Sequence, residues 1–236
     1  MNFWYILRDG WKSILDLFYP PLCMQCHERL EEGELFLCAN CFEHLPRTEM
    51  AANRGNRVEQ LFWDIPKFVR GAAFCFYRRS ESFRYMIHRM KYGNKPLIGE
   101  YLGEQAAKEF LPTGFFQEID LIVPVPLHPK RQRKRGYNQA GYIAKGISRA
   151  TGIPVDMVHL QRIVNNPTQT RKTGQERTKN TQGIFSVQTP ANWRGKHILL
   201  VDDIITTGAT LHACMKVITP IHGTSVSVMS LGVAGN

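Results

Sequence analysis

The chain has 236 residues, of which 43% are hydrophobic, so it is long enough to bury one substantial α/β core and a small additional module. Its formal net charge of +10 at pH 7 favours an anionic partner, a phosphorylated metabolite or a nucleic acid, although a merely basic protein has the same charge. No stretch of roughly 18 apolar residues occurs, which excludes a predicted transmembrane helix, and we expect a cytoplasmic protein.

Residues 1–20 predict a short amphipathic helix that ends at two consecutive prolines. Its apolar residues, such as Trp4 and Trp11, lie among charges, and the segment lacks the basic start, apolar core and cleavage site of a signal peptide. We favour a packing helix over a membrane or partner surface.

Two CxxC pairs dominate the next segment, residues 21–45, and 11 residues separate them. They comprise Cys23, Cys26, Cys38 and Cys41. Four thiolates at this spacing are the complement of a closed tetrahedral zinc site. Disulfides and an iron–sulfur cluster are the alternatives, and disulfides are disfavoured in a chain without an export signal. We therefore predict a structural zinc module.

Residues 46–70 are mixed in character and predict a linker with one short helix around 58–63. A strand is expected over Gly71–Tyr77. Apolar residues at i, i+3, i+4 and i+7 predict an amphipathic helix over Ser80–Lys91, and a second helix follows over Pro96–Phe110.

A basic loop is predicted after the strand Asp120–Pro126. Five cations fall in the six positions Lys130–Arg135, where they would repel one another without an anion to share. A helix is expected from about Tyr137 to Ala150, so the cations lie between a strand and a helix, where a pyrophosphate can bind. This position favours a binding site over a nonspecific nucleic-acid patch.

The polar, basic run Asn165–Asn180 is long for a connection without structure of its own, which is typical of a lid, with surface disorder as the alternative. Strands are predicted on either side of it, over Val158–Ile163 and Gly183–Val187, and a last strand over Thr224–Val233. The alternation of strands and helices predicts an α/β fold with a mostly parallel sheet and helices on both faces.

The stretch Ile198–Thr210, ILLVDDIITTGAT, reads as a buried strand, two carboxylates, a small-residue loop and the start of a helix. Ligands of parallel α/β sheets bind beyond the carboxyl ends of the strands. The loop comprises Thr206, Thr207, Gly208, Ala209 and Thr210, and its N–H groups and helix dipole suit a phosphate. Asp202 and Asp203 suit the vicinal hydroxyls of a ribose or a hydrated magnesium ion. Together they point to a ribose 5-phosphate rather than to an ordinary strand-to-helix turn.

The run VDDIITTGAT resembles the signature of type I phosphoribosyltransferases, which bind phosphoribosyl pyrophosphate (PRPP). The four-Cys module, the segment VPVPLHPKRQRKRGYNQA with its run RGYNQ, and the loop TQTRKTGQERTKNTQGIF make the chain similar to the ComF family of competence-associated phosphoribosyltransferase-like proteins of bacteria. The resemblance extends from Cys23 to about Leu231. It implies a type I transferase core, over residues 71–236, behind an N-terminal zinc module. In some members it also implies a link to the uptake of single-stranded DNA.

The resemblance also implies roles for particular residues. Asp202 and Asp203, the candidate catalytic residues, hold the ribose hydroxyls directly or through water on magnesium, and Thr206–Thr210 hold the 5-phosphate. The segment Val125–Arg135, with Arg131 and Arg135 as the preferred charges, takes the pyrophosphate, whose oxygens magnesium bridges. Arg177 or Lys179 arrives from the lid. The implied reaction transfers ribose 5-phosphate to an acceptor that the sequence does not name, since no base-reading motif is found.

A rival hypothesis is a zinc-containing module that binds single-stranded DNA without catalysis, or a protein that senses PRPP. The basic loops are interleaved with Tyr137, Tyr142 and Phe185, which are side chains on which bases can stack.

Overall fold

The computed structural model describes residues 19–78, 80–164 and 183–234. The chain divides into two compact units, Met1–Leu45 and Pro46–Asn236. Most of the helix predicted over residues 1–20 lies outside the described residues. Within them, no helix combines the length and the apolar character that crossing a membrane requires.

The first unit holds the four clustered cysteines, and its described part contains little regular structure. An isolated antiparallel bridge joins Leu22 to Arg29, and the short helix α2, Ala39–Glu43, begins directly after Cys38. Among its described residues, the buried apolar side chains are Cys23, Leu30, Leu37, Cys41 and Leu45. A core of the size that these described residues form is rarely stable without a cross-link or a metal.

A four-stranded parallel sheet forms the centre of the second unit, with the strand order β1-β6-β5-β2. The strands span Phe68–Phe76 (β1), Ser225–Val233 (β6), His197–Ile205 (β5) and Leu121–Pro124 (β2). β5 and β6 are largely buried on both faces, which explains their continuous apolar runs. The predicted parallel sheet is confirmed.

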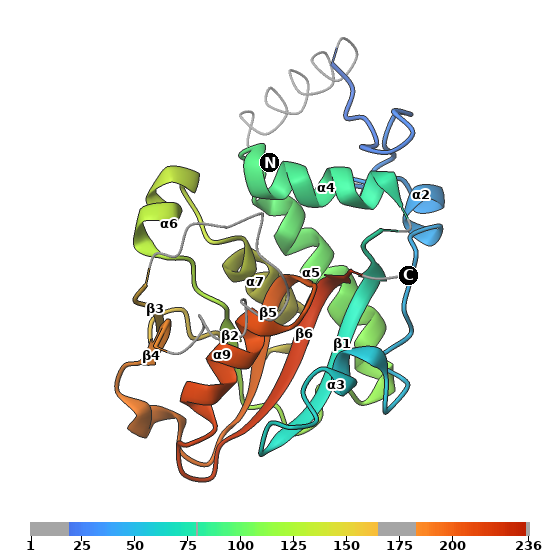
Figure 1. Ribbon diagram of the computed structural model, residues 1–236. Coiled ribbons are helices and arrows are strands. Elements are labelled where there is room, and N and C mark those ends of the chain that lie inside the picture. Colours follow the sequence, from blue (N-terminus) through green and yellow to red (C-terminus); the bar gives the residue numbers. More distant parts are fainter. Residues whose placement is uncertain (1–18, 79, 165–182, 235–236) are drawn as a thin grey trace, which may run out of the picture. The chain divides into compact units, whose positions relative to one another are not determined.

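Helices cover both faces of this sheet, as predicted. Figure 1 shows α5 and α7 behind the sheet and α3 and α9 in front of it. The helices span Arg57–Gln60 (α3), Glu81–Tyr92 (α4), Leu97–Phe110 (α5), Pro129–Arg135 (α6), Gln139–Thr151 (α7) and Ala209–Ile218 (α9), with 3₁₀ turns at Leu111–Thr113 and Pro190–Trp193.

The helices α5 and α7 pack against each other at glycines. A Cβ atom on Gly103 of α5 would collide with the carbonyl oxygen of Ile143 in α7, and a Cβ atom on Gly146 of α7 would collide with the carbonyl oxygen of Glu100 in α5. Gly in a helix interior costs about 0.5–1 kcal/mol relative to Ala. Here the missing side chains let the two backbones approach closely enough to pack side by side on one face of the sheet.

A two-stranded antiparallel sheet lies outside the main sheet. It pairs β3, Leu160–Arg162, with β4, Phe185–Val187. Both strands are shorter than the sequence predicted. The run between them, Asn165–Asn180, which was predicted to be a lid, lies outside the described residues, together with Arg177 and Lys179.

The segment 46–70, which the sequence suggested to be a linker, packs within the second unit. The amide of Thr48 donates to the carbonyl oxygen of Phe74, and the side chain of Asn56 donates to the carbonyl oxygen of Gly71. Both acceptors belong to β1. The short helix in this segment, α3, receives its N-cap from the same Asn56 side chain.

The basic segment after β2 is a helix, so the prediction of a loop there was wrong. The imidazole of His128 caps the N-terminus of α6 by accepting the amide of Lys130, and Pro129 occupies the first helical position. Gly136 ends the helix in the left-handed conformation with φ of 87°. These local signals outweigh the mutual repulsion of the cations. The negative end of the helix dipole at the C-terminus also attracts the cations and so reduces the cost of placing them there.

Candidate functional site

A cavity of about 830 Å³ opens in the second unit beyond the carboxyl ends of β2 and β5. Six residues predicted as site residues line it together: Val125, Arg131, Arg135, Asp202, Asp203 and Thr210. They come from two stretches of the chain, residues 125–135 and 202–210, which are far apart in the sequence. The cavity therefore brings the basic segment, the acidic pair and the end of the Thr–Gly loop into one space.

The other residues of the Thr–Gly loop lie in the chain between Asp203 and Thr210, which both line the cavity. Within the described part of the chain, Thr206, Thr207, Gly208 and Ala209 are not part of the cavity wall. Gly208 starts α9 with φ of +72°, and a Cβ atom there would lie 2.9 Å from the ring of Phe62. A glycine is therefore required to turn the chain from β5 into α9, whose first N–H groups have no partner within the helix.

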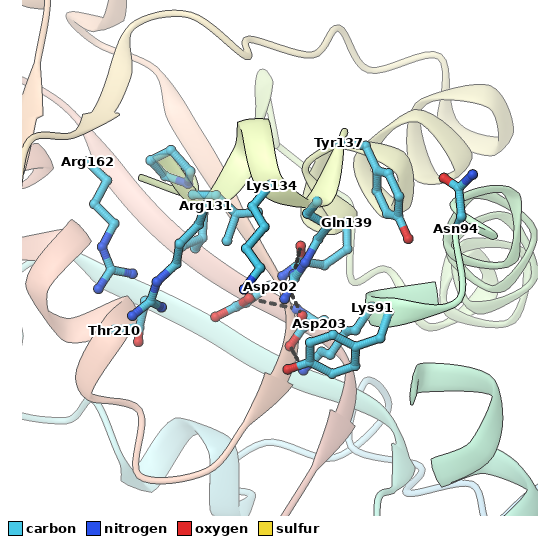
Figure 2. Close-up of a pocket in the computed structure, with 15 residues that line it drawn as sticks. Lys91, Asn94, Arg131, Lys134, Tyr137, Gln139, Arg162, Asp202, Asp203 and Thr210 are labelled. Carbon is cyan, nitrogen blue, oxygen red and sulfur yellow. Dashed lines mark hydrogen bonds and ion pairs between the residues drawn. The ribbon is translucent and has the colours of Figure 1, made fainter. Parts of the chain in front are cut away.

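The acidic pair lies at the centre of the cavity, and its two members have different surroundings (Figure 2). Asp203 is only 5% exposed, accepts a bond of 2.7 Å from Gln139 Nε2 and forms an ion pair of 2.8 Å with Lys91 Nζ. Asp202 is half-buried, and its Oδ1 accepts the backbone amide of Asp203 at 2.8 Å. Figure 2 shows Arg131, Lys134 and Arg162 on one side of Asp202, and Lys91 on the other.

The site perturbs the protonation of its ionisable groups. Burial, together with the charge of Asp203, raises the pKa of Asp202 from 3.8 to about 7. Burial alone would lower the pKa of Lys91, but the charge and hydrogen bond of Asp203 outweigh it and raise that pKa. The two aspartates therefore repel each other in a setting that a cation or a hydroxyl ligand would relieve.

We predict that Asp202→Asn raises the free energy of unfolding above pH 7. The pKa of Asp202 is raised in the folded state, so its contribution to stability is fully present below 3.8 and is lost as pH rises through about 7. The neutral amide avoids that loss, and the gain is expected to reach about 1–4 kcal/mol at pH 8, at about 1.36 kcal/mol for each pKa unit. Urea unfolding of both proteins between pH 4 and pH 8 measures it. A gain that does not change with pH would contradict this prediction.

The sequence did not identify several residues of the cavity wall as site residues. They are Lys91, Tyr92, Asn94, Lys134, Tyr137, Gln139 and Arg162. Lys134 lay within the predicted basic segment, and Tyr137 and Gln139 lay within the run RGYNQ, so a signal existed for these three; Tyr137 was named only as a side chain on which a base can stack. Lys91 lies in the last turn of a helix and Arg162 near the end of a strand. Both elements look ordinary in the sequence, and only the fold brings these two residues into the same cavity wall as the acidic pair.

The basic side of the cavity concentrates positive charge. Burial, together with the neighbouring charge of Arg131, lowers the pKa of Arg162. The pKa of His128 is also lowered, by desolvation and by the charges of Lys130, Arg162 and Arg131. Such a cluster is an anion-binding environment, and the neutral imidazole that it favours is the form that caps α6.

The first unit brings the four cysteines of the two CxxC pairs together. Their sulfur atoms all lie within 4.8 Å of one another, and all four thiols are free. Cys23 Sγ accepts the backbone amides of Gln25 and Cys38 at 3.5 and 3.4 Å. Burial alone would raise the pKa of Cys23, but the backbone amides of Cys26, Cys38 and Gln25 outweigh it and lower that pKa to about 6. The thiolate, the form that binds metals, is thus favoured at Cys23, whereas the pKa of Cys26 is raised and burial raises the pKa of Cys41.

A known family and a solved structure resemble parts of this chain. A family profile described as "Phosphoribosyl transferase domain" matches residues 132–231. Among solved structures, glutamine phosphoribosylpyrophosphate amidotransferase from B. subtilis, complexed with ADP and GMP, aligns with a TM-score of 0.42 at 22% identity, over 61% of this chain and 30% of that chain.

Three curated relatives match almost the whole chain. Competence protein F of Haemophilus influenzae is 25% identical, over 91% of this chain and 97% of that protein. DNA utilization protein YhgH of Escherichia coli (strain K12) is 28% identical, over 91% and 98%. Competence protein ComFC of Bacillus subtilis (strain 168) is 34% identical over 225 residues, which cover 93% of this chain and 87% of that protein. The chain therefore belongs to the ComF family of competence proteins and carries a phosphoribosyl transferase domain.

Proposed function

We propose that the second unit binds PRPP in the cavity and transfers its ribose 5-phosphate group to an acceptor, with release of pyrophosphate. One observation carries this proposal: a single cavity joins the acidic pair to Thr210 of the Thr–Gly loop and to Arg131 and Arg135 of α6. Ribose hydroxyls, 5-phosphate and pyrophosphate thus each meet a group of matching chemistry. The names of the relatives lead us to propose further that this activity is linked to DNA uptake.

The chemistry of the transfer explains why these groups are needed. When pyrophosphate leaves C1 of the ribose, positive charge develops on the sugar and negative charge on the leaving group. The acidic pair holds the ribose hydroxyls, and the residues Thr206–Thr210 bind the 5-phosphate. Arg131 and Arg135 take the pyrophosphate, and Lys134 and Arg162 add charge on the same side of Asp202 (Figure 2). Arg177 or Lys179, from the run Asn165–Asn180, would complete the enclosure and exclude water.

Magnesium fits this donor set. It prefers oxygen ligands and retains several waters, and Asp202 offers a half-buried carboxylate on the cavity wall. Asp202, directly or through water, and the pyrophosphate oxygens would hold the ion. When bound, it neutralises negative charge on the leaving group.

Isothermal titration with PRPP and magnesium tests the binding step, and a screen for pyrophosphate release over candidate acceptors tests the transfer. Binding in the micromolar range that is lost with inorganic phosphate in place of PRPP supports the proposal. Binding without pyrophosphate release from any acceptor would favour a PRPP sensor over a transferase. An absence of PRPP binding would overturn the proposed site.

A second candidate function, the binding of single-stranded DNA, has one observation in its favour. Lys130 and Arg133 of α6 are exposed, while Arg131 and Lys134 of the same helix line the cavity. Cations outside the cavity can contact a nucleic-acid backbone. DNA binding with steep salt dependence that Asp202→Asn does not change would favour this function, whereas competition between PRPP and DNA would indicate a shared site.

We also propose that Cys23, Cys26, Cys38 and Cys41 hold one structural zinc ion, in a module over residues 21–45. Zinc–sulfur bonds of about 2.3 Å in a tetrahedron separate the sulfurs by about 3.8 Å. The sulfur atoms of Cys26 and Cys38 lie 3.7 Å apart, which matches this geometry. A bound metal would also stabilise the fold of the first unit, whose described core is small.

We predict about one zinc per chain in protein prepared without chelator, measured by plasma mass spectrometry. Cys23→Ser is expected to lose the zinc and to unfold the first unit, while the second unit, which has its own core, stays folded. Cys75→Ala, at a buried cysteine of β1, serves as the control and should retain the zinc. Iron with a visible charge-transfer band, or no metal at all, would contradict the prediction.

A further inference from the structure

The run Arg135–Gln139, RGYNQ, holds the cavity wall together. Gly136 ends α6, and the hydroxyl of Tyr137 donates to the carbonyl oxygen of Met90 in α4. Asn138 caps α7 through its side-chain oxygen and donates through its nitrogen to the carbonyl oxygen of Val125 at 3.1 Å. Tyr137 and Asn138 thus tie the connection between α6 and α7 to α4 and to the segment after β2.

Gln139 links the basic side of the cavity to the acidic pair. Its side chain is buried, with the residue 6% exposed. Its Oε1 accepts a hydrogen bond from Arg135 Nη1, and its Nε2 donates to Asp203 Oδ2 at 2.7 Å. The reverse orientation of the amide would point its NH₂ group at a guanidinium and its oxygen at a carboxylate, so the two charged neighbours fix it.

Asp203 is consequently held on both sides by the protein. Gln139 occupies Oδ2, Lys91 Nζ lies 2.8 Å from Oδ1, and little of the carboxylate reaches the cavity. Asp202 differs from it. Its Oδ1 accepts the amide of Asp203, and among the described residues its Oδ2 has no hydrogen-bond partner.

We propose that the acidic pair is divided: Asp202 contacts the sugar hydroxyls, and Asp203 is a positioning residue that Gln139 and Lys91 hold in place. The inference rests on the proposed PRPP site and assigns its sugar contact to one carboxylate. In this arrangement, the guanidinium of Arg135, the amide of Gln139, the carboxylate of Asp203 and the ammonium of Lys91 form one chain of donors and acceptors, which sets the direction of Asp202 through the shared backbone.

A swap of two side chains tests this division. Asp203→Asn puts an NH₂ group opposite a donor, Gln139 Nε2 or Lys91 Nζ, and breaks the chain. Gln139→Glu puts two carboxylates side by side. In the double variant Asp203→Asn/Gln139→Glu, Lys91 donates to the new amide oxygen, the new NH₂ donates to the new carboxylate, and that carboxylate still accepts from Arg135. Every donor again meets an acceptor, and the total charge is unchanged.

The expected result is measured as PRPP affinity. Each single variant should bind PRPP about tenfold more weakly, and the double variant should return to within about threefold of the parent. The matched control is Gln117→Glu, the same change at an exposed glutamine that lies outside the basic segment and does not line the cavity, and it should stay close to the parent. A double variant as weak as Asp203→Asn would overturn the inference, because an Asp203 in contact with the ligand could not be replaced by its neighbour.

Discrimination between ribose 5-phosphate and 2-deoxyribose 5-phosphate provides a readout that a merely structural role would not move. The parent and the double variant should prefer the ribose compound by about tenfold, and Asp202→Asn should lose that preference. If a single variant fails to fold, the double variant and Asp202→Asn still test the division of roles between Asp202 and Asp203. A parent that binds neither PRPP nor ribose 5-phosphate would overturn the proposed function itself, whereas a parent that binds them beside an unrestored double variant would overturn only the division of roles.

Discussion

Replacing both Asp202 and Asp203 by Asn is expected to lower the affinity for PRPP, measured with magnesium by isothermal titration, at least about tenfold. A hydrogen bond to a charged group contributes roughly 1.5–3 kcal/mol, and each 1.4 kcal/mol is about a tenfold change in affinity. The variant with both substitutions to Asn loses the Asp202 carboxylate, which faces the cavity, and also the Asp203 carboxylate, which Lys91 and Gln139 hold. The largest loss is expected for ligands that carry both the ribose hydroxyls and the pyrophosphate.

Thr207→Val supplies the matched comparison, because it changes the loop that we assign to the 5-phosphate. It should weaken ribose 5-phosphate as much as PRPP and leave inorganic pyrophosphate unaffected. Should the double Asn variant bind PRPP as well as the parent, the phosphoribosyl site is misassigned, and the nucleic-acid function becomes the leading one.

Replacing Gly146 by Ala is expected to destabilise the second unit by about 3 kcal/mol or more, measured by urea unfolding. The new Cβ atom would collide with the carbonyl oxygen of Glu100 and approach the amide of Glu104 at 2.7 Å, and both belong to the backbone of α5. Backbone atoms cannot rotate away as a side chain can, so the two helices must separate. This cost exceeds the 0.5–1 kcal/mol or so that Ala gains over Gly in a helix.

Gly141→Ala in the same helix is the control. The atom nearest to its new Cβ would be Met157 Sδ at 3.7 Å, which is an ordinary contact. That variant should be as stable as the parent or slightly more so, because Ala is the better helix former. Equal effects at the two positions would mean that helix propensity, and not the close approach of α5 and α7, determines the outcome.

The sequence predicts those parts of the site whose residues lie close together in the chain. The strand of β5, the acidic pair and the loop to α9 follow one another within about a dozen residues, so their order alone indicates a ligand site at a sheet edge. The two CxxC pairs are informative for the same reason. The helix α6 also had local signals in the sequence, Pro129 at its start and Gly136 at its end. The sequence prediction gave more weight to the repulsion among the cations and therefore expected a loop.

The parts that the sequence does not predict arise from packing between distant segments. Lys91 lies in the last turn of the amphipathic helix α4, and nothing in its neighbourhood in the chain identifies it as the partner of Asp203. Arg162 ends β3, whose antiparallel pairing with β4 differs from the parallel order of the main sheet. From the sequence alone, the glycines of α5 and α7 indicate only lower helix stability. Their role in the close packing of the two helices becomes clear from the structure, where the two backbones touch at these positions.

The strand order has a consequence for how the chain folds during synthesis. β6, the last strand of the described chain, lies between β1 and β5, and its register joins Val226 to Phe68 on one side and to Ile198 on the other. Until β6 emerges from the ribosome, β1 and β5 each present an unpaired apolar edge. Such unpaired edges can pair with other chains, so we expect the nascent protein to depend on a chaperone or on rapid synthesis of β6.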